Sequence, residues 1–168
     1  VWCRGNQRYS YRSVSLKQAS APRGVVLPGR ISPIPNIGIL VDTSGSMSGP
    51  ILDMAGAEIH GILKSTTRAP ATVLSCDAEV NSIQKVRRIS EVNLGGGGGT
   101  DMRVGIEAVR KMRNSPNILL VLTDGYTPWP KSPIKGMRVV QVLVGDFCRD
   151  DSPAWMDSIR VENNNGDM

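Results

Sequence analysis

Apolar and polar residues are distributed along the chain in a way that predicts short buried strands separated by helices. Four continuous apolar runs suit strands covered on both faces, as in a parallel sheet. A further segment, 78–86, alternates well enough for an edge strand, with a possible turn at Asn81 and Ser82. An aspartate follows each apolar run closely. The runs and their aspartates are 36–41 with Asp42, 71–76 with Asp77, 117–123 with Asp124, and 137–144 with Asp146.

Two segments between these strands carry apolar residues at helical spacing. The first follows Ser48, a candidate cap, and extends over 50–62. The second extends over 101–112, with an acid at its start and basic residues at its end. Strands that alternate with helices predict an α/β fold: an open, mostly parallel, doubly wound sheet with helices on both faces. The four aspartates then share the carboxyl edge, where open α/β sheets bind ligands.

Length and composition fit one globular domain in a chain of 168 residues. We predict a proline-containing arm with irregular or edge structure at 1–35, the domain itself at 36–162, and a frayed tail at 163–168. No apolar run approaches the roughly 20 residues that cross a bilayer, and no secretory signal is visible, so we expect no membrane contact. Three cysteines without C-x-x-C spacing favour a reducing, cytoplasmic location. Because the first residue is Val1, we expect a processed product or a piece of a longer protein.

Positive charge is concentrated in the first 35 residues. This arm contains six basic residues and no acidic one, whereas the net charge of the whole chain is +5. The remainder of the chain therefore carries a net charge near −1. A basic arm of this kind suits contact with nucleic acid or with an acidic partner. The alternative is a solvated segment, or one that packs against a neighbouring domain, because the stacking pattern of an RNA-binding module is missing.

Three short clusters of oxygen-bearing side chains carry the candidate chemistry. They are D-T-S-G-S at 42–46, T-D at 100–101 after five glycines, and T-D-G at 123–125. These clusters offer carboxylates and hydroxyls, the donors that Mg²⁺ or Mn²⁺ prefers. Two carboxylates and three hydroxyls leave room for water or for the carboxylate of a partner protein. The predicted metal ligands are Asp42, Ser44, Ser46, Thr100 and Asp124.

The same motifs resemble a known type of metal site. D-T-S-G-S at 42–46, followed in order by Thr100 and Asp124, is similar to the metal-ion-dependent adhesion site of von Willebrand factor A (VWA) domains. The resemblance implies that Ser44, Ser46 and Thr100 bind the ion directly. It implies that Asp42 and Asp124 support them, often through water, and that an acidic residue of a protein partner completes the coordination. The segment after Val144 is too short for the long final helix of adhesion receptors, so we do not expect switching by helix movement.

Three further motifs are S-C-D-A-E-V at 75–80, G-G-G-G-T-D at 96–101 and L-T-D-G-Y at 122–126. Together with an early Trp and Arg and L-P-G at 27–29, they are similar to the bacterial VWA-like domain that follows a metallopeptidase-like region. This resemblance covers nearly the whole chain. It implies that an amino-terminal domain has been left out or lost, and that a MoxR-type AAA+ ATPase is a candidate partner.

An enzyme is the competing functional class. A metal-bound Asp42 suits a nucleophile in phosphate-ester hydrolysis, as in haloacid dehalogenase-like enzymes, but Ser44 replaces the second aspartate usual there. His60 lies outside any H-E-x-x-H pattern, and no base for a catalytic triad is evident. We therefore expect no catalytic residue, with a metal-dependent hydrolase or an accessory domain of a metallopeptidase-like protein as the alternative. Any peptidase activity is expected in a domain absent from this chain.

Three residues beside the clusters are candidates for supporting the site or touching a partner. Asp77 follows a strand and suits either a supporting group or a solvated loop acid. Asp101 suits a helix cap more than a metal ligand. Trp129, between two prolines, suits either a partner anchor or a ring folded over the sheet edge. The glycine run lacks the lysine of a phosphate-binding loop, so we expect it to present Thr100.

Overall fold

The computed structural model describes residues 8–15, 17–31, 36–47, 49–65, 70–94 and 98–161. The chain divides into two compact units, Val1–Pro35 and Asn36–Met168. The first boundary coincides with the end of the predicted basic arm. The predicted tail at 163–168 and the candidate cap Ser48 lie outside the described residues.

The first unit is a two-stranded antiparallel hairpin. Strand β1 (Arg8–Val14) pairs with β2 (Pro28–Ile31), and a short 3-10 helix, η1 (Gln18–Ser20), lies between them. Pro28 begins β2, a position where the missing N–H of proline does little harm. The side chain of Gln18 closes the loop, because its amide donates to the Val25 carbonyl at 2.8 Å and accepts from Leu27 N at 2.8 Å. The irregular or edge structure predicted for this arm is therefore an ordered hairpin over its described residues.

The second unit is built on a six-stranded sheet with the strand order β5-β4-β3-β6-β7-β8. All neighbouring strands are parallel except β4 and β5, which are antiparallel. The open, mostly parallel sheet predicted from the apolar runs is confirmed. The strands are β3 (Ile37–Asp42), β4 (Ala71–Cys76), β5 (Val80–Val86), β6 (Ile118–Thr123), β7 (Arg138–Leu143) and β8 (Asp157–Arg160).

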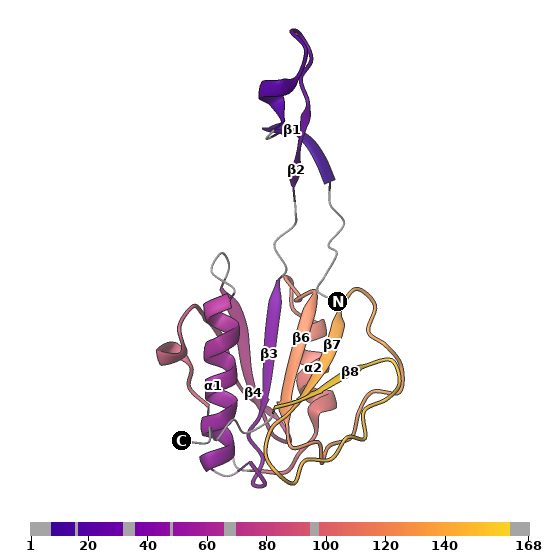
Figure 1. The fold of residues 1–168 in the computed structure, drawn as a ribbon. Coiled ribbons are helices and arrows are strands. Elements are labelled where there is room, and N and C mark those ends of the chain that lie inside the picture. Colours follow the sequence, from indigo (N-terminus) through magenta and orange to yellow (C-terminus); the bar gives the residue numbers. More distant parts are fainter. Residues whose placement is uncertain are drawn as a thin grey trace. The chain divides into compact units, whose positions relative to one another are not determined.

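Helices cover both faces of this sheet, as Figure 1 shows for α1 (Gly49–Ser65) in front and α2 (Met102–Arg110) behind. Side chains of β3 alternate between the two layers. Ile39 and Val41 belong to the apolar cluster that contains α1, whereas Leu40 belongs to the cluster that contains α2. Because both faces of β3 are buried, its sequence is a continuous apolar run and not an alternating one. The doubly wound arrangement is confirmed.

Two local features differ from, or add to, the expected pattern. Asn81 and Ser82 do not form a turn, because both lie inside β5, where alternating exposure marks an edge strand. A second 3-10 helix, η2 (Ile89–Glu91), follows β5 and packs on the α1 side. Cys76 is fully buried in the apolar cluster on the α2 side, and burial raises the pKa of its thiol to about 11. Of the helices in the described parts of the chain, none has the length and apolarity that a membrane span requires.

Candidate metal centre

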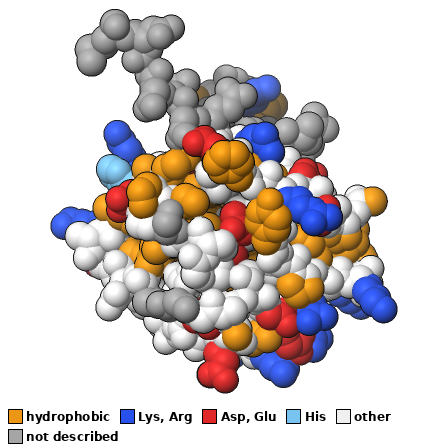
Figure 2. All heavy atoms as spheres, turned by 90° about the horizontal axis from the view of Figure 1, so that it is seen from below, with side chains coloured by type: hydrophobic (Ala, Val, Ile, Leu, Met, Phe, Trp, Pro, Cys, Tyr) orange, Lys and Arg blue, Asp and Glu red, His pale blue; other side chains and the backbone are white. Residues whose placement is uncertain are grey.

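Two of the sequence clusters, 42–46 and 123–125, meet at the carboxyl edge of the sheet, at the bottom of Figure 1. The third, 100–101, is tied to this edge through Asp101 N, which donates to the Asp77 carbonyl at 3.0 Å. Asp42 ends β3, while Asp77 and Asp124 directly follow β4 and β6, the two strands that flank β3. Asp146 lies three residues beyond β7 and is exposed, whereas the other three aspartates are buried. Figure 2 views this edge and shows acidic side chains near its middle, with hydrophobic side chains around them.

The segment after β3 forms a tight turn around the carboxylate of Asp42. Its Oδ1 accepts a hydrogen bond from Ser44 N at 3.0 Å, which is the geometry of an aspartate-initiated turn. The hydroxyl oxygens of Ser44 and Ser46 lie 3.1 Å apart. Asp42 and Ser44 are buried, whereas Ser46 is exposed. One hydroxyl of the pair therefore belongs to a buried residue and the other to a solvent-exposed one.

Thr123, the last residue of β6, fixes the second oxygen of the same carboxylate. Its hydroxyl donates to Asp42 Oδ2 at 2.7 Å and accepts from Gly125 N at 3.0 Å. Thr123 is fully buried, so this bond joins the ends of β3 and β6 away from water. Thr123 belongs to the T-D-G cluster of the sequence, whose pattern predicted no separate role for it. Its position as the last strand residue before Asp124 was the available signal.

Asp124 is held at the edge by its own backbone contacts. Its Oδ1 accepts from Tyr126 N at 3.1 Å, and its carbonyl accepts from Arg149 N at 2.8 Å. Gly125 follows with a positive φ of 90°, and a Cβ there would lie 1.8 Å from the Arg149 carbonyl oxygen. Only glycine fits this position, because both the backbone conformation and the available space exclude a side chain.

Two buried carboxylates lie close enough at this edge to affect each other. The pKa of Asp42 is raised above its ordinary value, first by burial and last by the negative charge of Asp124. Hydrogen bonds from Ser44 and Thr123 act in the opposite direction and only partly offset burial. Among the described residues, no lysine or arginine forms an ion pair with Asp42 or Asp124. In the described part of the chain, Asp42 and Asp124 therefore lack an ion-paired basic side chain.

The glycine segment is tied to this edge at its described end. Gly45 N donates to the Gly98 carbonyl at 3.3 Å, which brings the turn after β3 against the chain that leads to Thr100. Asp77 orders the same segment, because its carboxylate accepts from Gly98 N at 3.1 Å and from Glu79 N at 3.0 Å. Thr100, two residues after Gly98, is half-buried.

The remaining predicted contact residues have structural roles in this fold. Asp101 caps α2, accepting from Arg103 N at 3.0 Å and pairing with the Arg103 guanidinium at 2.7 Å. That pairing lowers the pKa of Asp101. Trp129 packs on the apolar cluster of the α2 side, and its indole Nε1 is buried without a hydrogen-bond partner in the described part of the structure.

The donor set suits a hard divalent cation. Its side chains offer carboxylate and hydroxyl oxygens only, which is the chemistry that Mg²⁺ or Mn²⁺ prefers. In the described ranges, no group of three or more histidine, cysteine, aspartate or glutamate residues is placed to hold a metal. A cation at this edge would therefore depend on the serine and threonine hydroxyls in addition to the two carboxylates.

Comparisons with known proteins agree with this fold. The most similar solved structures include an aerotolerance-related membrane protein from Bacteroides fragilis, in a variant with multiple mutations to serine. It is 16% identical, with a TM-score of 0.56, over 77% of this chain and 92% of the other. At such low identity, this likeness supports the fold alone.

Two further structures match with lower scores. The ArnB paralog VWA2 from Sulfolobus acidocaldarius is 12% identical, with a TM-score of 0.47, over 65% of this chain and 34% of the other. Proximal thread matrix protein 1 from the mussel byssus is 17% identical, with a TM-score of 0.48, over 64% of this chain and 35% of the other. No curated protein sequence matches the chain.

A protein-family model covers the second unit almost completely. The model of the VWA-like domain (DUF2201) matches residues 37–162, which is more than half of the chain. VWA-like domains generally act as protein-interaction modules and not as catalysts. The order of the strands, the helices on both faces and this match lead to one conclusion: the chain belongs to the VWA-like domain family DUF2201.

Proposed function

We propose that this domain binds a divalent cation, Mg²⁺ or Mn²⁺, at the carboxyl edge and uses it to recognise a protein partner. Ser44, Ser46 and Thr100 supply hydroxyl ligands. Asp42 and Asp124 balance the charge of the ion, directly or through water. A carboxylate of the partner occupies the remaining coordination position. The domain itself carries no catalytic residue under this proposal.

One observation supports the proposal most strongly. Asp42 is fully buried beside the paired hydroxyls of Ser44 and Ser46, and no basic side chain of the described residues neutralises it. A buried carboxylate without a counter-charge is costly, and a bound cation removes that cost. The pKa of Asp42 is raised for the same reason, because burial, its largest cause, disfavours the charged carboxylate.

A titration of thermal stability with Mg²⁺ tests the metal site. The melting temperature of the wild type should rise with ion concentration, and a concentration of about 100 times Kd should add about 2.7 kcal/mol to stability. Asp42→Ala and Asp124→Ala should abolish this response. Asp53→Ala removes an exposed carboxylate of α1 and serves as the matched control. An equal Mg²⁺ response in all four proteins would rule the site out.

The identity of the partner is the more specific part of the proposal. A protein with an exposed acidic side chain fits the open position of the ion, and a MoxR-type AAA+ ATPase is the candidate suggested by the family resemblance. Capture of partners in the presence of Mg²⁺, repeated with chelator and with Asp42→Ala, provides the test. A partner retained equally under all three conditions contradicts recognition through the metal.

A further inference from the structure

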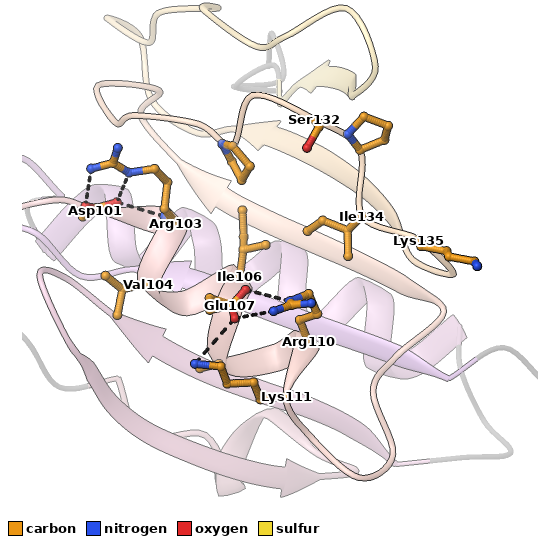
Figure 3. A pocket seen from close by; sticks show the side chains of 13 residues that line it. Asp101, Arg103, Val104, Ile106, Glu107, Arg110, Lys111, Ser132, Ile134 and Lys135 are labelled. Carbon is orange, nitrogen blue, oxygen red and sulfur yellow. Dashed lines mark hydrogen bonds and ion pairs between the residues drawn. The ribbon is translucent and has the colours of Figure 1, made fainter.

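An open groove of about 870 Å³ lies between α2 and the loop that follows β6. Figure 3 shows the two walls, with the side chains of α2 on one side and those of the loop on the other. This volume is within the range of sites that bind small molecules or short peptide segments. The lining residues are Asp101, Arg103, Val104, Ile106, Glu107, Ala108, Arg110, Lys111, Pro130, Ser132, Pro133, Ile134 and Lys135.

The floor of this groove is aliphatic. Ile106 from α2 and Ile134 from the loop lie toward each other between the charged ends in Figure 3. Both belong to the apolar cluster on the α2 side, so the groove reaches that layer of the core. Val104, at one side of the groove, is 40% exposed. An occupant with aliphatic side chains therefore removes apolar surface from water here.

The rim of the groove has an excess of positive charge. Arg103 is paired with Asp101 at 2.7 Å. Glu107 is shared by two cations, Arg110 at 2.6 Å and Lys111 at 3.5 Å. These contacts lower the pKa of Glu107 to about 2, chiefly through the hydrogen bonds from Arg110, so the carboxylate stays ionised at neutral pH.

Lys135 lies on the opposite wall from Glu107. It forms no ion pair with any carboxylate in the described parts of the chain. Two carboxylates and four cationic side chains therefore line the groove, which leaves an excess of positive charge. An acidic occupant would complement this excess charge.

We propose that this groove binds a short segment of a partner protein in which aliphatic and acidic residues alternate. The aliphatic side chains contact Ile134 and Val104, above the buried Ile106, and the acidic side chains approach Lys135 and the Arg110–Lys111 pair. Nucleic acid fits less well, because no aromatic side chain lines the groove for bases to stack on. This binding uses none of the proposed metal ligands, so it is independent of the cation.

The proposal is tested with the full chain in chelator and a short fluorescein-labelled peptide of alternating leucine and glutamate. Fluorescence anisotropy should show saturable binding. Peptides that alternate leucine with lysine, or serine with glutamate, should bind at least about tenfold more weakly, because each lacks one of the two complementary features. Backbone amide shifts in NMR should cluster at 103–111 and 130–135.

A pair of charge reversals separates specific docking from general attraction. Lys135→Glu should weaken peptide binding by about tenfold. Lys131→Glu makes the same charge change in the same loop but outside the lining, and should alter affinity by less than about twofold. Val104→Ser, at an exposed position of the groove, should weaken binding by about threefold, and thermal melts should show that all three variants remain folded.

Several results would overturn the proposal. They are absence of saturable peptide binding, equal loss in Lys131→Glu and Lys135→Glu, peptide-induced shifts at 42–46 instead of the groove, and a solution dimer that covers the groove. Preferential binding of a single-stranded oligonucleotide at 103–111 would also overturn it. Because the assay contains chelator, failure of the metal proposal leaves the expected result unchanged.

Discussion

Asp42 combines features that normally exclude each other in a stable domain. Its carboxylate is fully buried, yet it lies near a second carboxylate, Asp124, and forms no ion pair with a basic side chain among the described residues. Two hydrogen bonds, from Ser44 N and the Thr123 hydroxyl, hold it in place. The residue is thus positioned at the expense of stability, which is typical of functional sites.

Replacement of the Asp42 carboxylate by an amide should show how much this buried charge lowers the stability of the fold. In chelator, we expect Asp42→Asn to be more stable than the wild type by an amount on the order of 1 kcal/mol, because the buried charge is lost. The amide can still accept from Ser44 N and can donate to the Thr123 oxygen. Urea denaturation of both proteins measures the difference, and Asp53→Asn on α1 is the exposed control. A large loss of stability in Asp42→Asn would contradict this account.

The pKa of Asp42 also predicts how this difference depends on pH. Because burial raises that pKa in the folded state, folding favours the protonated form. The stabilisation linked to protonation is complete below the unfolded pKa and is lost as pH rises through the folded one. In chelator, the stability deficit of the wild type relative to Asp42→Asn should therefore shrink as the pH is lowered toward the ordinary aspartate pKa of about 4. Parallel denaturation curves at several pH values check this, and a deficit that grows toward acid would contradict it.

At the level of single residues, the sequence was informative about chemistry and less so about contacts. The oxygen-bearing residues at 42–46 and at Asp124 were identifiable because each follows an apolar run. The bond from Thr123 to Asp42 was not, because it joins residues 81 positions apart through a side-chain rotamer. The tie between Asp77 and Gly98 was hidden for the same reason: a glycine run specifies no backbone path.

The helices provide matched glycines with opposite expected effects on substitution. A Cβ on Gly105 of α2 would lie 2.7 Å from the Leu40 side chain of β3 and 3.1 Å from Cys76 Sγ. Gly105→Ala should therefore destabilise the fold by about 1–3 kcal/mol through overpacking, despite the better helix propensity of alanine. No described atom outside the helix lies within 4 Å of a Cβ on Gly61 of α1.

Gly61→Ala should accordingly stabilise the fold by about 0.5–1 kcal/mol. Urea denaturation of both variants and the wild type measures whether each substitution raises or lowers the free energy of unfolding. Stabilisation by Gly105→Ala would show that α2 packs less closely on β3 than the structure indicates.

At the level of elements, segments with a strong pattern were predictable and segments without one were not. The buried strands and both helices of the second unit follow from apolar runs and helical spacing. The hairpin of β1 and β2 was not foreseen as such, because prolines obscure its strand pattern. The prediction of a turn at Asn81 and Ser82 was wrong, because the alternation of exposed and partly buried side chains along β5 outweighs the turn preference of asparagine. The groove beside α2 was invisible, since three loop prolines do not specify where a loop lies.

The whole molecule separates its charge by unit. The first 35 residues hold six basic residues and no acidic one, in a chain of net charge +5. Deletion of 1–35 should therefore lower the salt concentration at which the protein elutes from heparin, while the Mg²⁺ response of the second unit stays unchanged. Lys131→Gln, which removes one positive charge from the second unit, should change elution little. Loss of the Mg²⁺ response on deletion would show that residues 1–35 contribute to the cation site.

The position of β3 has a consequence for selectivity among ions. This strand is paired on both edges and buried on both faces, so Asp42 and the turn after it extend from one of the most constrained parts of the sheet. Thr100, in contrast, is attached to a glycine segment. An ion held between them would meet two hydroxyls on the turn that continues β3 and a third on a segment held by the hydrogen bonds of Gly98 with Asp77 and Gly45 in its described part. A cation of larger radius, such as Ca²⁺, would then be accommodated by movement of 98–100 and not of the strand.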